Sequence, residues 1–119
     1  MGQFNRTMRI GDEIKKVIGM LIEREINDPR IGFVTITGAK VSRDLSIATV
    51  YVTTGETDDL EETMAGLSAA AGFLRKRLGE SIKLRSTPEL RFIYDGSLDR
   101  GFEMDALLKR LSDERNDLQ

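Results

Sequence analysis

Apolar residues recur at helical spacing in two long stretches of the chain, 10–26 and 60–78. In the first stretch, Ile14 and Leu21 belong to an apolar row with charged residues between its members, which is the pattern of an amphipathic helix. In the second, the apolar positions form one stripe along the helix. The apolar faces of the two predicted helices must be buried against each other or against a sheet, so the fold contains helices packed on a second layer of secondary structure.

The segments between and after these stretches have the composition of strands. Residues 33–37 and 47–52 are rich in β-branched side chains, and a short connection around Arg43 separates them, so they predict a hairpin. A third strand is predicted over 90–94, where side chains alternate between two faces. Its core face would carry Leu90, Phe92 and Tyr94.

Local signals predict where the helices end. Asp28 precedes a proline, and a residue in that position avoids the helical conformation, so the first helix is expected to stop near Ile26. Asp58 and Glu61 have the spacing of a capping box for the second helix. Gly79 is a candidate C-terminal cap.

Small residues interrupt the second helical stretch at Ala70, Ala71 and Gly72. Glycine costs about 1 kcal/mol in a helix interior, and the neighbouring alanines leave the backbone poorly covered. We therefore expect a bend at Gly72. Close helix packing is the alternative reason for a glycine at this position.

The order of elements predicts a single α+β domain, α-β-β-α-(kink)-α-β, with the helices on one face of a three-stranded mixed sheet. A short C-terminal helix around Leu107 would follow. A chain of 119 residues is long enough for one core and too short for two. We expect residues 9–111 to form this domain, 1–8 an N-terminal arm and 112–119 a flexible tail.

The chain contains no cysteine, histidine or tryptophan. This composition excludes disulfides, thiol nucleophiles and every mechanism that needs an imidazole. We expect no catalytic residue, no metal and no cofactor. A hydrolase using Asp58 with Glu61 is the weakest alternative, because no Gly-rich phosphate loop or metal-ligand framework accompanies the pair. Since no apolar run is long enough for a membrane span, we expect a soluble cytoplasmic protein.

Charge is unevenly distributed along the chain, although the formal net charge is only −2. Residues 51–63 carry five acidic side chains and no basic one, whereas residues 75–91 carry six basic and two acidic ones. A phosphate backbone meets a local patch and not the average charge. The basic segment is therefore a candidate for binding nucleic acid.

Several phrases of the sequence, in order and at compatible spacing, resemble the ribosome-binding factor A family. They run from Asn27 to Gly32, Val41 to Ser46, Ala70 to Arg75 and Pro88 to Phe92. The resemblance covers residues 9–111 and implies a type II K-homology domain, in which the usual Gly-x-x-Gly loop is replaced by a kink of Ala-x-Gly type. Ala70, Ala71 and Gly72 fit that kink.

The resemblance also implies a function. Members of the family assist late maturation of the small ribosomal subunit and end-processing of its rRNA in bacteria, and they are associated with cold adaptation. The implied partners are small-subunit rRNA, the immature 30S subunit, ribosomal proteins and a GTPase that releases the factor, and we expect the chain to be a monomer. The alternative is a protein-interaction module that docks on ribosomal proteins, or on a second copy, through the open sheet face.

Candidate RNA contacts combine the kink with cationic side chains. On the helical wheel Arg75 and Arg77 lie on either side of the apolar stripe and Lys76 points away from it, so the three cannot grip one row of phosphates. For every cation the alternative is a solvated polar surface. The predicted RNA-binding residues are Ala70, Ala71, Gly72, Arg75, Lys76, Arg77, Lys83, Arg85, Arg9, Lys16 and Arg43.

Overall fold

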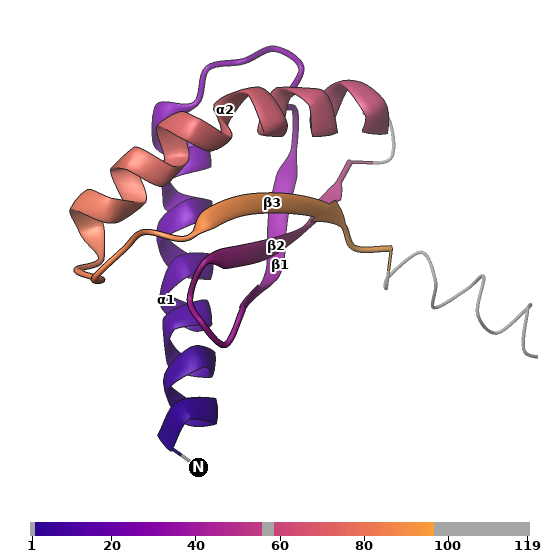
Figure 1. The fold of residues 1–119 in the computed structure, drawn as a ribbon. Helices are drawn as coiled ribbons and strands as arrows, with labels where there is room; N and C mark the ends of the chain where they lie inside the picture. Colours follow the sequence, from indigo (N-terminus) through magenta and orange to yellow (C-terminus); the bar gives the residue numbers. More distant parts are fainter. Residues whose placement is uncertain (1, 56–58, 97–119) are drawn as a thin grey trace, which may run out of the picture.

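The structure is a computed structural model of the chain, and it describes residues 2–55 and 59–96. Along this part the elements are α1 (Gly2–Glu25), β1 (Val34–Val41), β2 (Ile47–Thr54), α2 (Leu60–Ser81) and β3 (Glu89–Tyr94) (Figure 1). The predicted C-terminal helix and tail lie outside the described residues.

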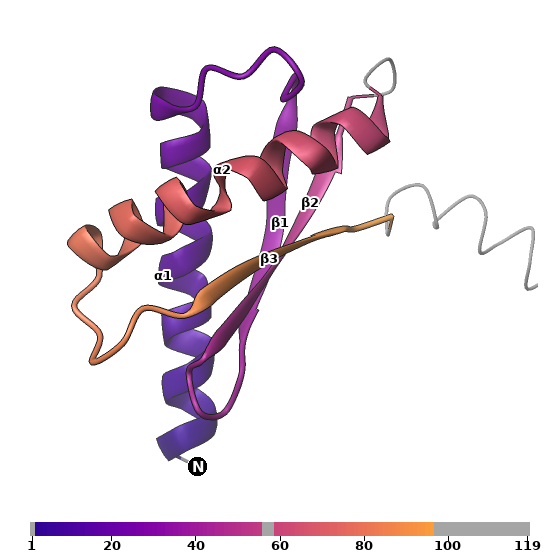
Figure 2. The same cartoon turned by 45° about the horizontal axis from the view of Figure 1, so that its top comes forward.

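The sheet has the order β1-β2-β3, with β1 antiparallel to β2 and β2 parallel to β3. Parallel neighbours need a crossover connection, and α2 provides it. Both helices lie on the same side of the sheet (Figures 1 and 2). The predicted α+β class, with helices on one face of a three-stranded mixed sheet, is confirmed.

The core lies between the two helices and the sheet. α1 contributes an apolar row that includes Ile14 and Ile18, both fully buried, and β2 contributes alternate residues such as Val50. The prediction for the core face of the third strand is confirmed for Leu90, which is buried, and for Phe92, which packs against the core, whereas Tyr94 is half-buried and is not part of the core cluster. The buried hydrophobic residues are Ile10, Ile14, Ile18, Leu21, Ile22, Ala48, Val50, Val52, Leu67, Leu74, Leu78, Ile82 and Leu90.

α1 is longer at its start than the apolar pattern suggests. It begins at Gly2, so residues 2–8, expected to be an arm, are helical. An apolar pattern marks only the turns that pack on the sheet, and residues 6–9, which precede the buried Ile10, are exposed or half-buried. The end of the helix at Glu25 agrees with the signal from Asp28, whose carboxylate accepts hydrogen bonds from the backbone and guanidinium of Arg30 in the following turn.

The hairpin is also longer than predicted. β1 continues to Val41 because a bulge between Ile36 and Gly38 lets the pairing with β2 resume after the break in alternation. In the connecting turn the amide of Leu45 donates to the carbonyl of Ser42 at 2.9 Å. Leu45 has a φ of 63°, a left-handed conformation that is rare for a bulky residue.

The ends of α2 correct two predictions. Its N-cap is Asp59, whose carboxylate accepts from the amide of Glu62, so the cap lies one residue after the predicted Asp58. Capping spacing suits both carboxylates equally in the sequence, and only the packing of the helix decides between them. Gly79 is not a cap, because α2 runs on to Ser81 with Ile82 as C-cap. Instead a Cβ at Gly79 would lie 2.6 Å from Thr87 Oγ1, which indicates a close approach.

α2 is one continuous helix and not two separate ones. Figure 1 shows that its axis changes direction along its length. Apart from the backbone of α2 itself, no atom of the described residues lies within 4 Å of a Cβ added at Gly72, so packing of the described neighbouring elements does not require glycine there. The close-packing alternative therefore does not explain Gly72.

Two other glycines do allow a close approach. A Cβ at Gly11 of α1 would lie 2.6 Å from the carbonyl oxygen of Ala39 in β1. One at Gly66 of α2 would lie 2.8 Å from Ile31 Cγ1, in the segment that follows α1. Each helix therefore approaches a neighbouring segment at a position where only hydrogen fits.

We predict opposite effects for two matched glycine substitutions. Gly11→Ala forces α1 away from a backbone carbonyl and should lower the free energy of unfolding by about 1–3 kcal/mol. In Gly72→Ala the added methyl group points into open space, so the free energy of unfolding should rise by about 0.5–1 kcal/mol. Urea unfolding followed by circular dichroism measures both, and a Gly11→Ala variant as stable as the parent would contradict the packing described for α1.

Candidate nucleic-acid interface

One end of the sheet brings together two loops that are distant in sequence. The amide of Glu89, at the start of β3, donates to the carbonyl of Ser46 at 2.8 Å. The hairpin turn, residues 42–46, therefore lies beside the loop of residues 82–88 that leads into β3. We call these two loops together with Arg91 the hairpin end. Gly11 approaches Ala39 near the last residues of β1, so the early turns of α1 reach toward the same end.

The hairpin turn is held by its own polar side chains. Asp44 Oδ1 accepts from the hydroxyls of Ser42 and Ser46 and from the Ser46 amide, at 2.7–3.1 Å. The hydrogen bonds from Ser46 and Ser42 hold the pKa of Asp44 below its ordinary value. The turn therefore presents the exposed Arg43 from an ordered backbone.

Arg75 anchors the second loop. Its guanidinium donates two hydrogen bonds, from Nε and Nη2, to the carbonyl oxygen of Thr87 at 3.1 and 2.8 Å. The neighbouring Pro88 is fully buried. Because a carbonyl carries no net charge, Arg75 keeps its positive charge while it holds the loop against α2.

The hairpin end carries three of the eight predicted cations, together with Arg91. Lys83 and Arg85 are exposed on the loop that Arg75 anchors, and Arg43 is exposed on the hairpin turn. Arg91 lies in β3, and its side chain is 56% exposed. Its Nε is 3.7 Å from Oε1 of Glu89. A pair at that distance on an exposed surface contributes little, so these side chains remain available to an anion.

Arg77 differs from the other predicted contacts because carboxylates neutralise it. Its Nε and Nη2 donate to Glu25 at 2.9 and 2.7 Å, and its Nη1 donates to Glu80. The hydrogen bonds to these carboxylates raise the pKa of Arg77. The ion pair with Glu25 joins the end of α1 to α2. Arg77 therefore has a structural partner that the sequence did not reveal.

The helical-wheel prediction for α2 is confirmed in its geometry. Arg75 reaches Thr87 while Arg77 reaches Glu25, which belong to different elements, and Lys76 is exposed between them in sequence. The remaining predicted cations, Arg9 and Lys16, are exposed on α1. The predicted residues therefore do not form one continuous patch.

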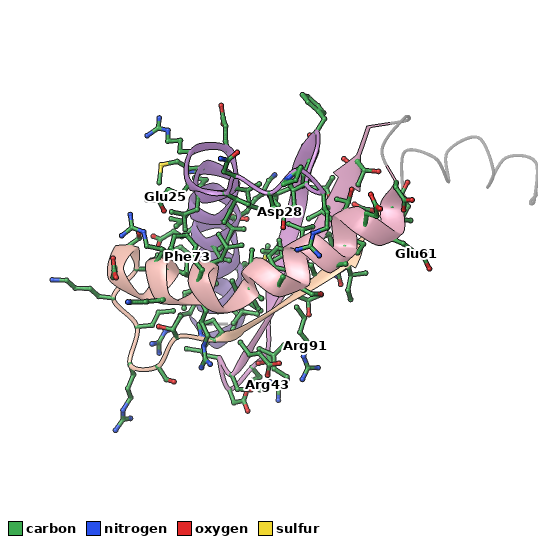
Figure 3. All side chains as sticks on the ribbon, turned by 90° about the horizontal axis from the view of Figure 1, so that it is seen from above. Glu25, Asp28, Arg43, Glu61, Phe73 and Arg91 are labelled. Atoms are coloured by element: carbon green, nitrogen blue, oxygen red, sulfur yellow. The ribbon has the colours of Figure 1, made fainter. Side chains whose placement is uncertain are left out.

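The small residues of α2 leave a shallow hollow of about 310 Å³ against the end of α1. It is lined by Glu25, Ile26, Asn27, Asp28, Ala69, Ala70 and Phe73. Figure 3 shows Glu25, Asp28 and Phe73 on one side of the view and Arg43 and Arg91 on the other. On the first side the carboxylates of Glu25 and Asp28 are paired with Arg77 and Arg30, whereas Arg43, Lys83 and Arg85 of the hairpin end form no ion pair within the described residues. A polyanion is favoured at the hairpin end.

Two further observations concern other classes of site. Within residues 2–55 and 59–96, no group of acidic side chains is arranged to hold a metal ion. No helix in the same part of the chain is long and apolar enough to cross a membrane. Asp58, named in the hydrolase alternative, lies outside the described residues.

Comparison with known proteins identifies the family. The model of the ribosome-binding factor A family matches residues 6–108. The chain belongs to the ribosome-binding factor A family. Ribosome-binding factor A of Stutzerimonas stutzeri is 47% identical, over 97% of this chain and 98% of that protein.

Solved structures of the family share the fold. The crystal structure of ribosome-binding factor A from Thermus thermophilus has a TM-score of 0.69 and 25% identity, covering 74% of this chain and 93% of that one. A homology model of the Thermus thermophilus factor, fitted into a cryo-EM map of a 30S–RbfA complex, has a TM-score of 0.64 and 24% identity, covering 76% and 96%. At that identity the second likeness shows the fold alone.

Sequence reasoning missed how the hairpin end is built. The adjacency of residues 42–46 and 82–88 follows from the parallel pairing of β2 with β3, which a strand pattern does not specify. No sequence pattern predicts the hydrogen bonds from Arg75 to the carbonyl of Thr87, because every residue has a carbonyl that can accept such bonds. The ion pair of Arg77 with Glu25 joins residues that are 52 positions apart.

We predict that Glu25 contributes to the pH dependence of stability. The hydrogen bonds from Arg77 lower the pKa of Glu25 below its ordinary value of 4.5. The ion pair therefore stabilises the fold above that value, and its contribution is lost as the pH falls through the lowered pKa. The difference in urea midpoint between the parent and Glu25→Gln should shrink between about pH 6 and about pH 3.

Glu23→Gln is the matched control, because Glu23 is an exposed carboxylate of the same helix for which the described residues provide no ion pair. The gap between this variant and the parent should stay nearly constant over the same pH range. A gap for Glu25→Gln that is as constant as the control would contradict the role assigned to the ion pair.

Proposed function

We propose that the chain is a non-catalytic assembly factor that binds the immature small (30S) ribosomal subunit and its rRNA. In this role it assists late maturation and end-processing of small-subunit rRNA. Membership of the ribosome-binding factor A family is the observation that carries the proposal. The related Thermus thermophilus factor, described in a 30S complex, supports the choice of partner. Such a partner places the chain in the bacterial cytoplasm.

The mechanism we propose needs binding and no bond chemistry. A protein that binds one conformation of rRNA more tightly than another shifts the folding equilibrium of the RNA by the difference in affinity. A shaped cationic surface is sufficient for this task. The absence of histidine and cysteine from the chain agrees with a role that requires no nucleophile or proton relay.

The hairpin end is the surface we propose for the RNA backbone. Arg43, Lys83 and Arg85 are exposed there, and Arg75 holds the loop while keeping its own charge. Lys76, Arg9 and Lys16 would extend the contact along α2 and α1. Because two carboxylates already pair with Arg77, we expect it to contribute least among the predicted cations.

The kink is proposed as a second contact. Ala70 and Ala71 are half-buried and Gly72 is exposed, and within the described residues a Cβ at Gly72 would meet no atom beyond the backbone of its own helix within 4 Å. An RNA strand could therefore approach the backbone at Gly72 closely. Among the described residues the lining of the neighbouring hollow contains no cation, and its carboxylates Glu25 and Asp28 are paired with Arg77 and Arg30, so the strand is expected on the side of Arg75.

Sedimentation tests the proposed partner. The purified chain should sediment with free small subunits and not with complete ribosomes, because the proposed target is the immature particle. The measurement is a sucrose gradient of a bacterial lysate, with the chain detected in each fraction. Recovery only at the top of the gradient, or evenly through all fractions, would contradict the proposal.

The salt dependence of rRNA binding tests the proposed surface. Arg43→Gln and Arg85→Gln should each reduce the slope of log affinity against log salt by about 0.7–0.9 for each phosphate that the side chain no longer neutralises. Filter binding or fluorescence anisotropy with a small-subunit rRNA fragment measures the slope. Arg75→Gln should weaken binding more than Arg85→Gln, since it also releases the loop that carries Lys83 and Arg85.

Arg30→Gln is the matched control for these variants. Arg30 is also exposed, but it lies beyond the end of α1, where Asp28 pairs with it at 2.7 Å. The slope should be unchanged in this variant. Equal effects of Arg30→Gln and Arg43→Gln would show that the hairpin end has no special role.

A further inference from the structure

A second hollow lies on the opposite edge of the sheet from β3, between α1 and the start of β1. Its volume is about 800 Å³. The lining includes Gly19 and Met20 of α1 and Val34 to Ile36 of β1. Met20 is 39% exposed and Phe33, also in the lining, is 76% exposed. The hollow therefore has exposed apolar groups beside a strand.

That strand offers backbone hydrogen-bonding groups at its outer edge. In the described part of the chain β1 pairs with β2 alone, so its other edge faces outward. Gly55 donates to the Phe33 carbonyl at 3.1 Å, which directs the groups of Phe33 and Thr35 toward β2. By the same alternation Val34 and Ile36 direct their amides and carbonyls outward, toward the hollow.

The two halves of β1 differ in how this edge is protected. After Ile36 the strand has a bulge, and it continues with the exposed Lys40; both features discourage pairing with another strand. Before the bulge, Val34 to Ile36 is regular and contains no charge. The unprotected half is the one that lines the hollow.

Cations surround the hollow. Lys15, Lys16 and Arg24 line it, with Glu23 as the one acidic residue of the lining. The ion pairs formed within the described residues involve none of these three cations. The charge at the rim therefore complements an acidic ligand.

We infer that the hollow between α1 and β1 binds an extended, acidic segment of a partner protein, which adds a strand to β1 at Val34 and Ile36. The backbone of the segment would pair with the outward groups of these two residues. Alternate side chains would pack against Met20 and Gly19, and acidic residues would lie near Lys15 and Arg24. The hollow lies apart from the hairpin end and shares only Lys16 with the proposed RNA surface, so this interaction goes beyond the proposed RNA binding.

Polypeptide fits this site better than RNA does. Strand addition uses evenly placed amides and carbonyls, which a nucleic acid backbone does not supply. Gly19 and aliphatic side chains such as Ile22 and Ile36 form the apolar part of the lining, beside the outer edge of β1 that strand addition needs. A matching segment alternates β-branched and small polar residues and has acidic residues at its ends. The β-branched side chains would face Gly19 and Met20, and the acidic ones would face Lys15 and Arg24.

The test is an NMR titration of the full chain with a synthetic peptide of about nine residues, in which valine and threonine alternate between acidic ends. Saturable amide shifts should map to residues 15–24 and 32–36. Met20→Glu should weaken binding by about tenfold or more, because it places a carboxylate in the apolar part of the lining. Met8→Glu, at an exposed methionine of the same helix outside the hollow, should leave the affinity unchanged within about twofold.

Each other outcome would overturn the inference. A peptide with lysines in place of the acidic ends should not bind. If it bound as tightly as the acidic peptide, the cations at the hollow would not select an acidic ligand. Shifts that map to α2, or no saturation, would exclude the site. Slow hydrogen exchange of the Val34 and Ile36 amides in the chain without peptide would mean that another segment or a second copy already covers the edge. An rRNA fragment producing the same shifts would assign the hollow to RNA.

Discussion

The parallel pairing of β2 with β3 is the constraint on which the rest of the structure depends. It requires a crossover, which α2 provides, and so it places both helices on one face of the sheet. It also brings the amide of Glu89 to the carbonyl of Ser46, which joins the hairpin turn to the loop before β3. The cationic hairpin end exists only because of this pairing.

The electrostatics of the molecule depend on which cations have carboxylate partners. Arg30 and Arg77 are paired with Asp28 and Glu25 near the end of α1, where each helps to fix a connection between elements. Arg75 makes a comparable structural contact, but with a carbonyl oxygen. A guanidinium can therefore order a loop and still attract phosphate when its partner is neutral. This distinction separates the proposed binding surface from the cations that serve the fold.

Glycines set how closely each helix approaches a neighbouring segment. Gly11 and Gly66 each allow a helix to meet a neighbouring segment at a distance that an alanine would not permit. Gly72 has no such neighbour among the described residues, so the backbone is open at the position of the predicted kink. The two halves of β1 also differ at their outer edge: the bulge and Lys40 protect one half, whereas the half beside the hollow has neither of these features.

The sequence by itself determined the elements and their apolar faces. The period of the row containing Ile14 and Ile18 predicts α1, alternation predicts Leu90 and Phe92 on the core face, and Asp28 before proline predicts the end of α1, because each signal is a local property of the chain. The phrases around Ala70 to Gly72 and Pro88 to Phe92 also indicated the family correctly.

Tertiary structure decided the rest. It chose Asp59 and not Asp58 as the cap, placed Gly79 against Thr87, and paired Arg77 with Glu25 while leaving Arg75 its charge. These outcomes depend on which distant residue lies within a few ångströms. A single sequence does not encode that distance in any local pattern, because it is set by the packing of whole elements against one another.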